Sequence, residues 1–152
     1  MKTKSNMQVL AVALLMITLF AGGCANVPLA SVEDDTRAKT HSVPAGKSVI
    51  YVYRNESFGG AIPMTVLLDR RAIGQTGAQT YFMFEVEPGE HEIGSLAENT
   101  SFLKLTTVAD KAYYVWQEVK MGMWKARSLL QQVDDATGRA GVAESKRAQP
   151  SP

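Results

Sequence analysis

The sequence predicts a mainly β protein, a single antiparallel β-sandwich of about eight strands, and two observations lead to this prediction. From residue 48 onward, short runs rich in β-branched and aromatic residues follow one another, separated by Gly, Pro, Asn and Asp. No connection between these runs is long enough for a crossover helix, so neighbouring strands are expected to pair antiparallel. The chain has 152 residues, 45% of them hydrophobic and 20% charged, which fits one folded domain.

The runs differ in how deeply we expect them to be buried. SVIYVYR (48–54) is almost entirely apolar, as is typical of a central strand buried on both faces. TYFMFEVE (80–87) alternates, so one of its faces should pack on the core. The Pro88–Gly89 pair after it predicts a type II turn. Further strands are predicted at 61–69, 72–76, 91–97, 101–108, 112–120 and 124–133.

The segments around the sandwich, which is expected to span 48–147, read differently. Residues 24–47 mix Pro, Ala, Ser and charges and predict a tether, with a short helical turn at 31–39. Residues 134–145 favour a short helix weakened by two glycines, and 148–152 are expected to be a disordered tail.

The N-terminus predicts a signal peptide over residues 1–23. Lys2 and Lys4 form a basic start, and VLAVALLMITLF (9–20) is an unbroken apolar stretch followed by small residues. This apolar stretch is shorter than the ~20 residues that span a bilayer, although an uncleaved anchor over 7–25 is the competing interpretation. The single cysteine of the chain, Cys24, comes directly after this segment.

The stretch LFAGGCA, residues 19–25, resembles the bacterial lipoprotein signal, with Ala21 where such signals more often carry leucine. The resemblance implies cleavage between Gly23 and Cys24 and attachment of lipid to the Cys24 thiol. With Ala25 next in the chain, it also implies export to the outer membrane, facing the periplasm. A free cysteine is more commonly a buried small hydrophobe, but its position beside Gly22 and Gly23 argues against burial. Two or more acyl chains would hold the domain stably at the membrane.

The chain also resembles two groups of proteins along its folded part. Residues 66–93 are similar to a PEGA-type module. More closely, residues 27–147 resemble a family of uncharacterised bacterial lipoproteins with a domain of unknown function. That resemblance implies an immunoglobulin-like or transthyretin-like sandwich outside the cytoplasm, and no reaction. It is carried by PAGKSVIYVYRNE (44–56), LLDRRAIG (67–74), VEPGEH (86–91) and DKAYYVWQE (110–118).

Charge and motif content argue against several functions. Removing residues 1–23 leaves 14 basic and 15 acidic residues. The remaining chain therefore has no excess of positive charge that would attract nucleic acid. PAGKS (44–48) lacks the first glycine of a phosphate-binding loop, since residue 41 is histidine. Two distant histidines, His41 and His91, cannot supply a zinc site, and we expect no metal and no cofactor. His91 is expected to be a solvated strand residue. The glutamates at 85, 87, 90 and 92 are expected to form an acidic face on one hairpin.

Two features are candidates for a binding surface. Arg54 lies beside the glycine-rich stretch SFGGA (57–61) and is expected to pair with a carboxylate or, less readily, to recognise a partner. Tyr114, Trp116 and Trp124 form an aromatic group that either packs in the core or stacks on a sugar or peptide.

The sequence therefore predicts a non-catalytic, lipid-anchored protein of the cell envelope that has a structural or interaction role with an envelope partner. The alternative is an envelope module that binds glycan or peptide through its surface aromatics. No catalytic constellation is recognised, so the chain is not expected to be an enzyme.

Overall fold

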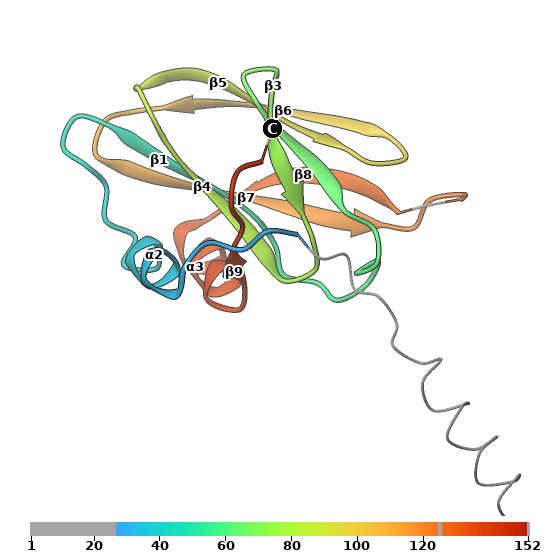
Figure 1. Cartoon of the computed structure of the whole chain (residues 1–152). Coiled ribbons are helices and arrows are strands. Elements are labelled where there is room, and N and C mark those ends of the chain that lie inside the picture. Colours follow the sequence, from blue (N-terminus) through green and yellow to red (C-terminus); the bar gives the residue numbers. More distant parts are fainter. Residues whose placement is uncertain (1–26, 125, 152) are drawn as a thin grey trace, which may run out of the picture.

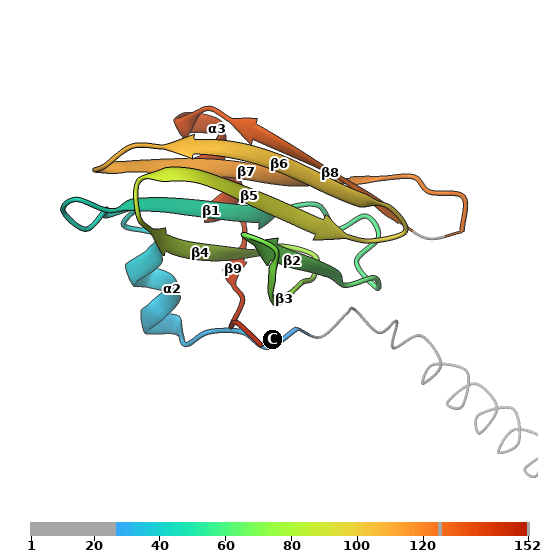
Figure 2. The ribbon, with the colours of Figure 1, turned by 90° about the horizontal axis from the view of Figure 1, so that it is seen from above.

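The computed structural model describes residues 27–124 and 126–151, and within them two β-sheets pack face to face (Figures 1 and 2). The first sheet contains β1 (Ser48–Arg54), β4 (Thr80–Val86), β7 (Lys111–Lys120), β8 (Arg127–Val133) and β9 (Lys146–Arg147). The second contains β2 (Met64–Leu68), β3 (Arg71–Thr76), β5 (Gly89–Leu96) and β6 (Thr100–Thr107). The helices α2 (Val32–Ala38) and α3 (Asp135–Ala143) lie on the side of the first sheet that faces away from the second.

The predicted sandwich is confirmed, but its pairing is not purely antiparallel. The first sheet has the order β8–β7–β1–β4–β9, in which β1 pairs parallel with β7 and β4 pairs parallel with β9. The second sheet, β3–β2–β5–β6, is antiparallel throughout. The prediction considered only helical crossovers, whereas here the chain leaves the first sheet, adds strands to the second and returns, which allows parallel neighbours without a helix.

The connection between β4 and β5 corrects a second expectation. These strands lie in different sheets, so the glutamates at 85, 87, 90 and 92 do not bracket one hairpin. Gly89 has φ of 151°, far from the value near +80° that a type II turn needs at this position. A tight hairpin turn occurs instead between β2 and β3, where Asp69 and Arg70 both have positive φ.

The main core lies between the two sheets. Phe82, Phe84 and Val86 of β4 point into it, as their alternation predicted. They pack with Ile50 and Val52 of β1 and with residues of β2, β5, β6, β7 and β8. Every residue of β1 is buried, which confirms the expectation of a central strand covered on both faces.

A second apolar layer covers the outer face of the first sheet. Its centre is a group of buried tyrosines, Tyr51, Tyr53, Tyr81 and Tyr114, beneath α2 and α3. The Tyr51 hydroxyl donates a hydrogen bond to the Ala38 carbonyl at 2.7 Å, and the Tyr81 hydroxyl donates to the Asp35 carboxylate at 2.8 Å. These hydroxyls therefore bond to α2 while their rings supply the apolar contact.

The described part of the predicted tether, residues 27–47, packs on the domain. Val27 is buried, Leu29 bridges to Ala148, and the Ala30 amide donates to the Arg147 carbonyl. The tail expected to be disordered is ordered through residue 151, whose amide donates to the Ile73 carbonyl at 2.8 Å. Backbone pairing between the two ends of the domain holds both segments. The predicted short helices exist as α2, capped by Ser31, and α3, capped by Asp134.

Within residues 27–124 and 126–151, the structure contains no helix with the length and apolar character needed to cross a bilayer. The predicted signal segment 1–23, its cleavage position and Cys24 lie outside the described residues.

Candidate functional site

Arg54 is not a surface residue, and its hydrogen bonds go to backbone carbonyls of the neighbouring loop. Its side chain is fully buried at the end of β1, where the loop 57–62 folds back over it. The guanidinium donates to the carbonyls of Ile62 at 2.8 Å, Gly59 at 2.7 Å and Phe58 at 3.2 Å. Burial lowers the pKa of this guanidinium and the nearby Glu56 carboxylate opposes the shift. Arg54 is therefore the residue that holds the loop against the sandwich.

The three candidate aromatic residues do not share one surface. Tyr114 is buried, stacks on Tyr51 with ring centroids 5.1 Å apart, and its hydroxyl lies 3.0 Å from His41 Nδ1. Trp116 is half-buried against the same outer layer. Trp124 is 86% exposed, in the turn between β7 and β8. The candidate binding surface of the sequence is thus divided between the buried end of β1, the tyrosine layer and an exposed turn.

His91 is held more firmly than the sequence suggests, because both ring nitrogens have partners. Nδ1 lies 2.9 Å from Asp69 Oδ2, and Nε2 lies 2.8 Å from the Glu87 carbonyl oxygen. The side chain is only 12% exposed, which corrects the expectation of a solvated strand position. It lines a hollow of about 290 Å³ with Glu90, Glu92 and Lys104 among others. Because both ring nitrogens lie within hydrogen-bond distance of protein oxygens, His91 holds the β2–β3 turn against the end of β4.

This arrangement predicts a pH-dependent contribution to stability. Burial alone lowers the pKa of His91, but the hydrogen bonds to the Glu87 carbonyl and to Asp69 outweigh it, so the pKa is raised. The contribution is therefore fully present below the unfolded value near 6.5 and is lost as the pH rises through the folded pKa. Urea denaturation of the wild type from pH 5 to 8 should show this loss, and His91→Gln should remove it. The prediction fails if the two proteins keep a constant difference in free energy across this range.

A large groove lies beside α2. It measures about 780 Å³ and is bounded by α2, the outer face of β4 and the C-terminal segment. Arg37, Arg147, Asp34 and Glu85 place both signs of charge along it, and Met83 forms part of its floor. Because the charges are mixed, the groove indicates no single class of ligand.

A buried polar network between the sheets was not recognised in the sequence. The Thr76 hydroxyl donates to Gln117 Oε1 at 2.5 Å, and Gln117 Nε2 donates to the Ser95 hydroxyl at 2.6 Å. All three side chains are fully buried. Their hydrogen bonds are satisfied by one another, so the network fixes the relative position of β3, β5 and β7.

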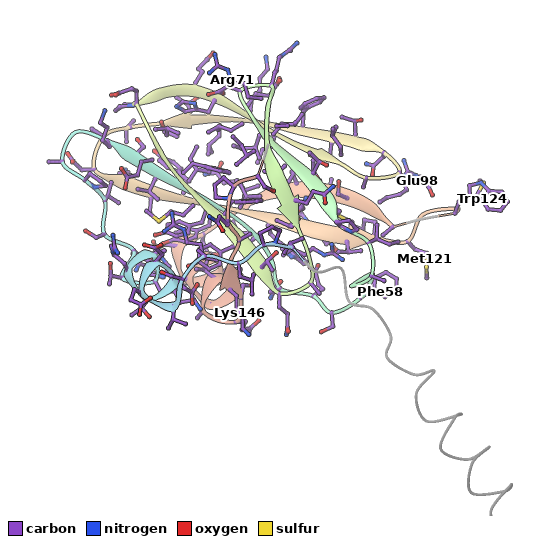
Figure 3. All side chains as sticks on the ribbon, in the orientation of Figure 1. Phe58, Arg71, Glu98, Met121, Trp124 and Lys146 are labelled. Atoms are coloured by element: carbon purple, nitrogen blue, oxygen red, sulfur yellow. The ribbon has the colours of Figure 1, made fainter. Side chains whose placement is uncertain are left out.

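The β7–β8 tip, defined here as Met121, Gly122, Met123 and Trp124, is an exposed apolar surface of which the sequence singled out only Trp124. Met121 and Met123 are each 82% exposed, and Phe58 of the neighbouring loop is 54% exposed. In Figure 3 the Trp124 side chain lies at the far end of the tip, with Met121 and Phe58 on the same end of the molecule. The strands predicted at 112–120 and 124–133 leave residues 121–123 between them without an assigned role, although Met and Trp here and Phe in the adjacent loop are together a signal of an interaction surface.

A group of side chains that could hold a metal ion is absent from residues 27–124 and 126–151, counting clusters of three or more His, Cys, Asp or Glu.

Comparison with known proteins places the chain in a family. Residues 44–128, from the segment before β1 into β8, match the family described as "Protein of unknown function (DUF2846)". The chain belongs to this family. It is also 30% identical over 134 residues to an uncharacterized protein of Haemophilus influenzae, covering 87% of this chain and 80% of that protein. No solved structure matches the chain. The DUF2846 match includes Arg54, His91 and the β7–β8 tip, and it ends before α3.

Proposed function

We propose that the chain is a non-catalytic lipoprotein of the bacterial cell envelope, whose domain is held at the membrane surface by lipid on Cys24. The observation that carries this proposal is the short distance along the chain between the lipoprotein-like motif and the folded domain. Cys24 stands three positions before Val27, which is already buried in the sandwich.

The spacing has a geometric consequence. Three extended residues reach about 10 Å. Because Leu29 bridges to Ala148 and the Ala30 amide bonds to the Arg147 carbonyl, the chain after Val27 provides no further slack. A lipid on Cys24 would hold the sandwich close to the bilayer with one end toward it. An arrangement of this kind suits a protein that contacts an envelope partner from a fixed position.

The non-catalytic part of the proposal is supported by the state of the polar groups. His91 has both nitrogens engaged, and Arg54 donates to backbone carbonyls. The two ring nitrogens of His91 and the two terminal nitrogens of Arg54 therefore have structural partners that account for their positions. The outer membrane is proposed as the location because Ala25, not aspartate, follows Cys24, as the resemblance to lipoprotein signals implies.

Cys24→Ala tests the anchor. We expect the variant to lose lipid and to accumulate either as unprocessed precursor or as soluble protein, since only a thiol forms the thioether. Membrane fractionation and mass spectrometry of the N-terminal peptide measure this directly. Ala21→Leu, which restores the more common residue, is the matched control and should be processed at least as well as the wild type.

The same fractionation tests the location. Ala25→Asp should move the lipidated protein away from the outer membrane while leaving the lipid in place. An unlipidated wild-type N-terminus, or Cys24→Ala protein that stays in the membrane with its signal retained, would contradict the proposal.

A further inference from the structure

We propose that the β7–β8 tip inserts into the surface of the phospholipid bilayer beside the Cys24 anchor, so that the domain meets the membrane at two points. The orientation of the domain at the membrane rests on the proposed function. Insertion of the tip is a separate property and has its own test.

The tip carries more exposed apolar surface than a solvated turn needs. Met121, Met123 and Trp124 are all more than four-fifths exposed, and Phe58 adds a fourth apolar side chain from the loop beside them. The tip projects beyond the body of the sandwich (orange in Figure 1), so these side chains are not covered by any described segment. Contiguous exposed apolar groups of this kind mark interaction sites with proteins or membranes.

The tip is also held in its extended position. The Glu98 carboxylate, in the loop between β5 and β6, accepts hydrogen bonds from the amides of Met123 at 3.1 Å and Trp124 at 2.8 Å. Figure 3 shows Glu98 beside the tip. At its base, Val119 and Ala126 pack with Met64 in a small buried cluster. These contacts hold the backbone of the tip in a position from which its apolar side chains point outward.

The position of the chain start favours a bilayer as the occupant. A Cβ on Gly60 would lie 3.3 Å from the Cβ of Ala78, and Ala78 lines a hollow together with Val27. The loop 57–62, which lies beside the tip, is thus also close to the segment that contains Val27. Since Cys24 is within about 10 Å of Val27 along the chain, a lipid on Cys24 would bring the side of the domain that carries this loop toward the membrane.

The chemistry of the tip agrees with that position. Tryptophan prefers the membrane interface, where its ring is apolar and its indole N–H stays near the headgroups. Arg127 is exposed just beyond the tip and can meet lipid phosphate, while the Lys120 ammonium is paired with Glu118. The expected insertion is shallow, because the tip and Phe58 form a small apolar patch.

Tryptophan fluorescence can test the insertion, because the chain has two tryptophans in different surroundings. Trp116→Phe leaves Trp124 as the reporter, and it removes an indole Nε1 that is buried with no hydrogen-bond partner among the described residues. Trp124→Phe is the matched control and leaves half-buried Trp116 as the reporter. Both full-length proteins are reconstituted into phosphatidylethanolamine–phosphatidylglycerol vesicles with or without brominated acyl chains.

We expect brominated chains to lower Trp124 emission about twofold and to leave Trp116 emission nearly unchanged. Adding Met121→Ser and Met123→Ser should reduce the quenching of Trp124. Flotation of the vesicles scores the anchor independently. If the full-length protein floats but Trp124 is not quenched, the proposed insertion of the tip is wrong and the proposed anchor stands. If the protein does not float, the proposed anchor is contradicted. A Trp124 blue shift that depends on protein density but not on bromine would show contact between copies of the chain and would also overturn the proposal.

Discussion

Replacement of Gly138 by alanine is expected to destabilise the protein by about 3 kcal/mol or more, although the same change in an exposed helix stabilises by about 1 kcal/mol. A Cβ at Gly138 would lie 2.0 Å from Tyr114 Cγ and 2.2 Å from Tyr114 Cβ. Both atoms are close to the backbone of β7, so no rotation of the tyrosine side chain relieves the overlap. The helix α3 would have to move off the sheet and expose part of the tyrosine layer.

Urea denaturation followed by far-UV circular dichroism measures this effect through the free energy of unfolding. Ala136→Gly in the same helix is the matched control, because Ala136 is exposed and the change should cost only the propensity difference of about 1 kcal/mol. A Gly138→Ala protein as stable as the wild type would show that α3 does not pack on Tyr114 as described.

The two glycines of α3 illustrate what a sequence pattern can and cannot predict. The prediction of a short helix over 134–145 is confirmed by α3, whereas the expected weakening at Gly138 and Gly141 stays a prediction. The sequence gives no sign that Gly141 faces the Tyr53 ring, where a Cβ would lie 2.1 Å from Cε2. Helix propensity predicts the destabilising effect of a glycine within a helix. It cannot predict the packing role of these glycines, because that role depends on strands far away in the chain.

The positions of the strands could be predicted from the sequence, but their order in the sheets could not. Apolar runs and alternation locate β1 and β4, because the pattern of apolar residues in a strand reflects which of its faces are buried. The neighbours of β1 in the sheet are β4 and β7. In the sequence, all four strands of the second sheet lie between β1 and β7. Pairing of this kind is decided by packing of the whole domain, and so the parallel β1–β7 pair was missed.

The candidate site shows the same division. Tyr114 and Trp116 are two positions apart on β7, so strand alternation places both on the outer face. Trp124 comes after Gly122, beyond the end of the strand, and no alternation applies to it. The exposure of the tip follows from the hydrogen bonds that Glu98 makes to its backbone, which link residues 25 and 26 positions apart.

Arg54→Met is expected to lower the free energy of unfolding by about 3 kcal/mol, because it removes the donors for three loop carbonyls. The methionine is apolar and fits the buried position, so the loss measures the hydrogen bonds more than the packing. Arg54→Lys should recover little, since one ammonium cannot reach carbonyls on both sides of the loop as the guanidinium does. Arg71→Met, at an exposed position labelled in Figure 3, is the matched control and should change stability by less than about 0.5 kcal/mol.

The consequence should be local as well as global, because the loop that Arg54 holds also supports the β7–β8 tip. A Cβ at Gly59 would lie 3.1 Å from Val119 and 3.4 Å from Ala126, the residues at the base of the tip. Hydrogen exchange should therefore accelerate in residues 57–62 and 121–124 of Arg54→Met and remain slow in the tyrosine layer around Tyr51 and Tyr81. Uniform acceleration would mean that Arg54 stabilises only the whole domain. Unchanged exchange and unchanged stability would mean that the guanidinium does not hold the loop, and Arg54 would then return as a candidate for partner recognition.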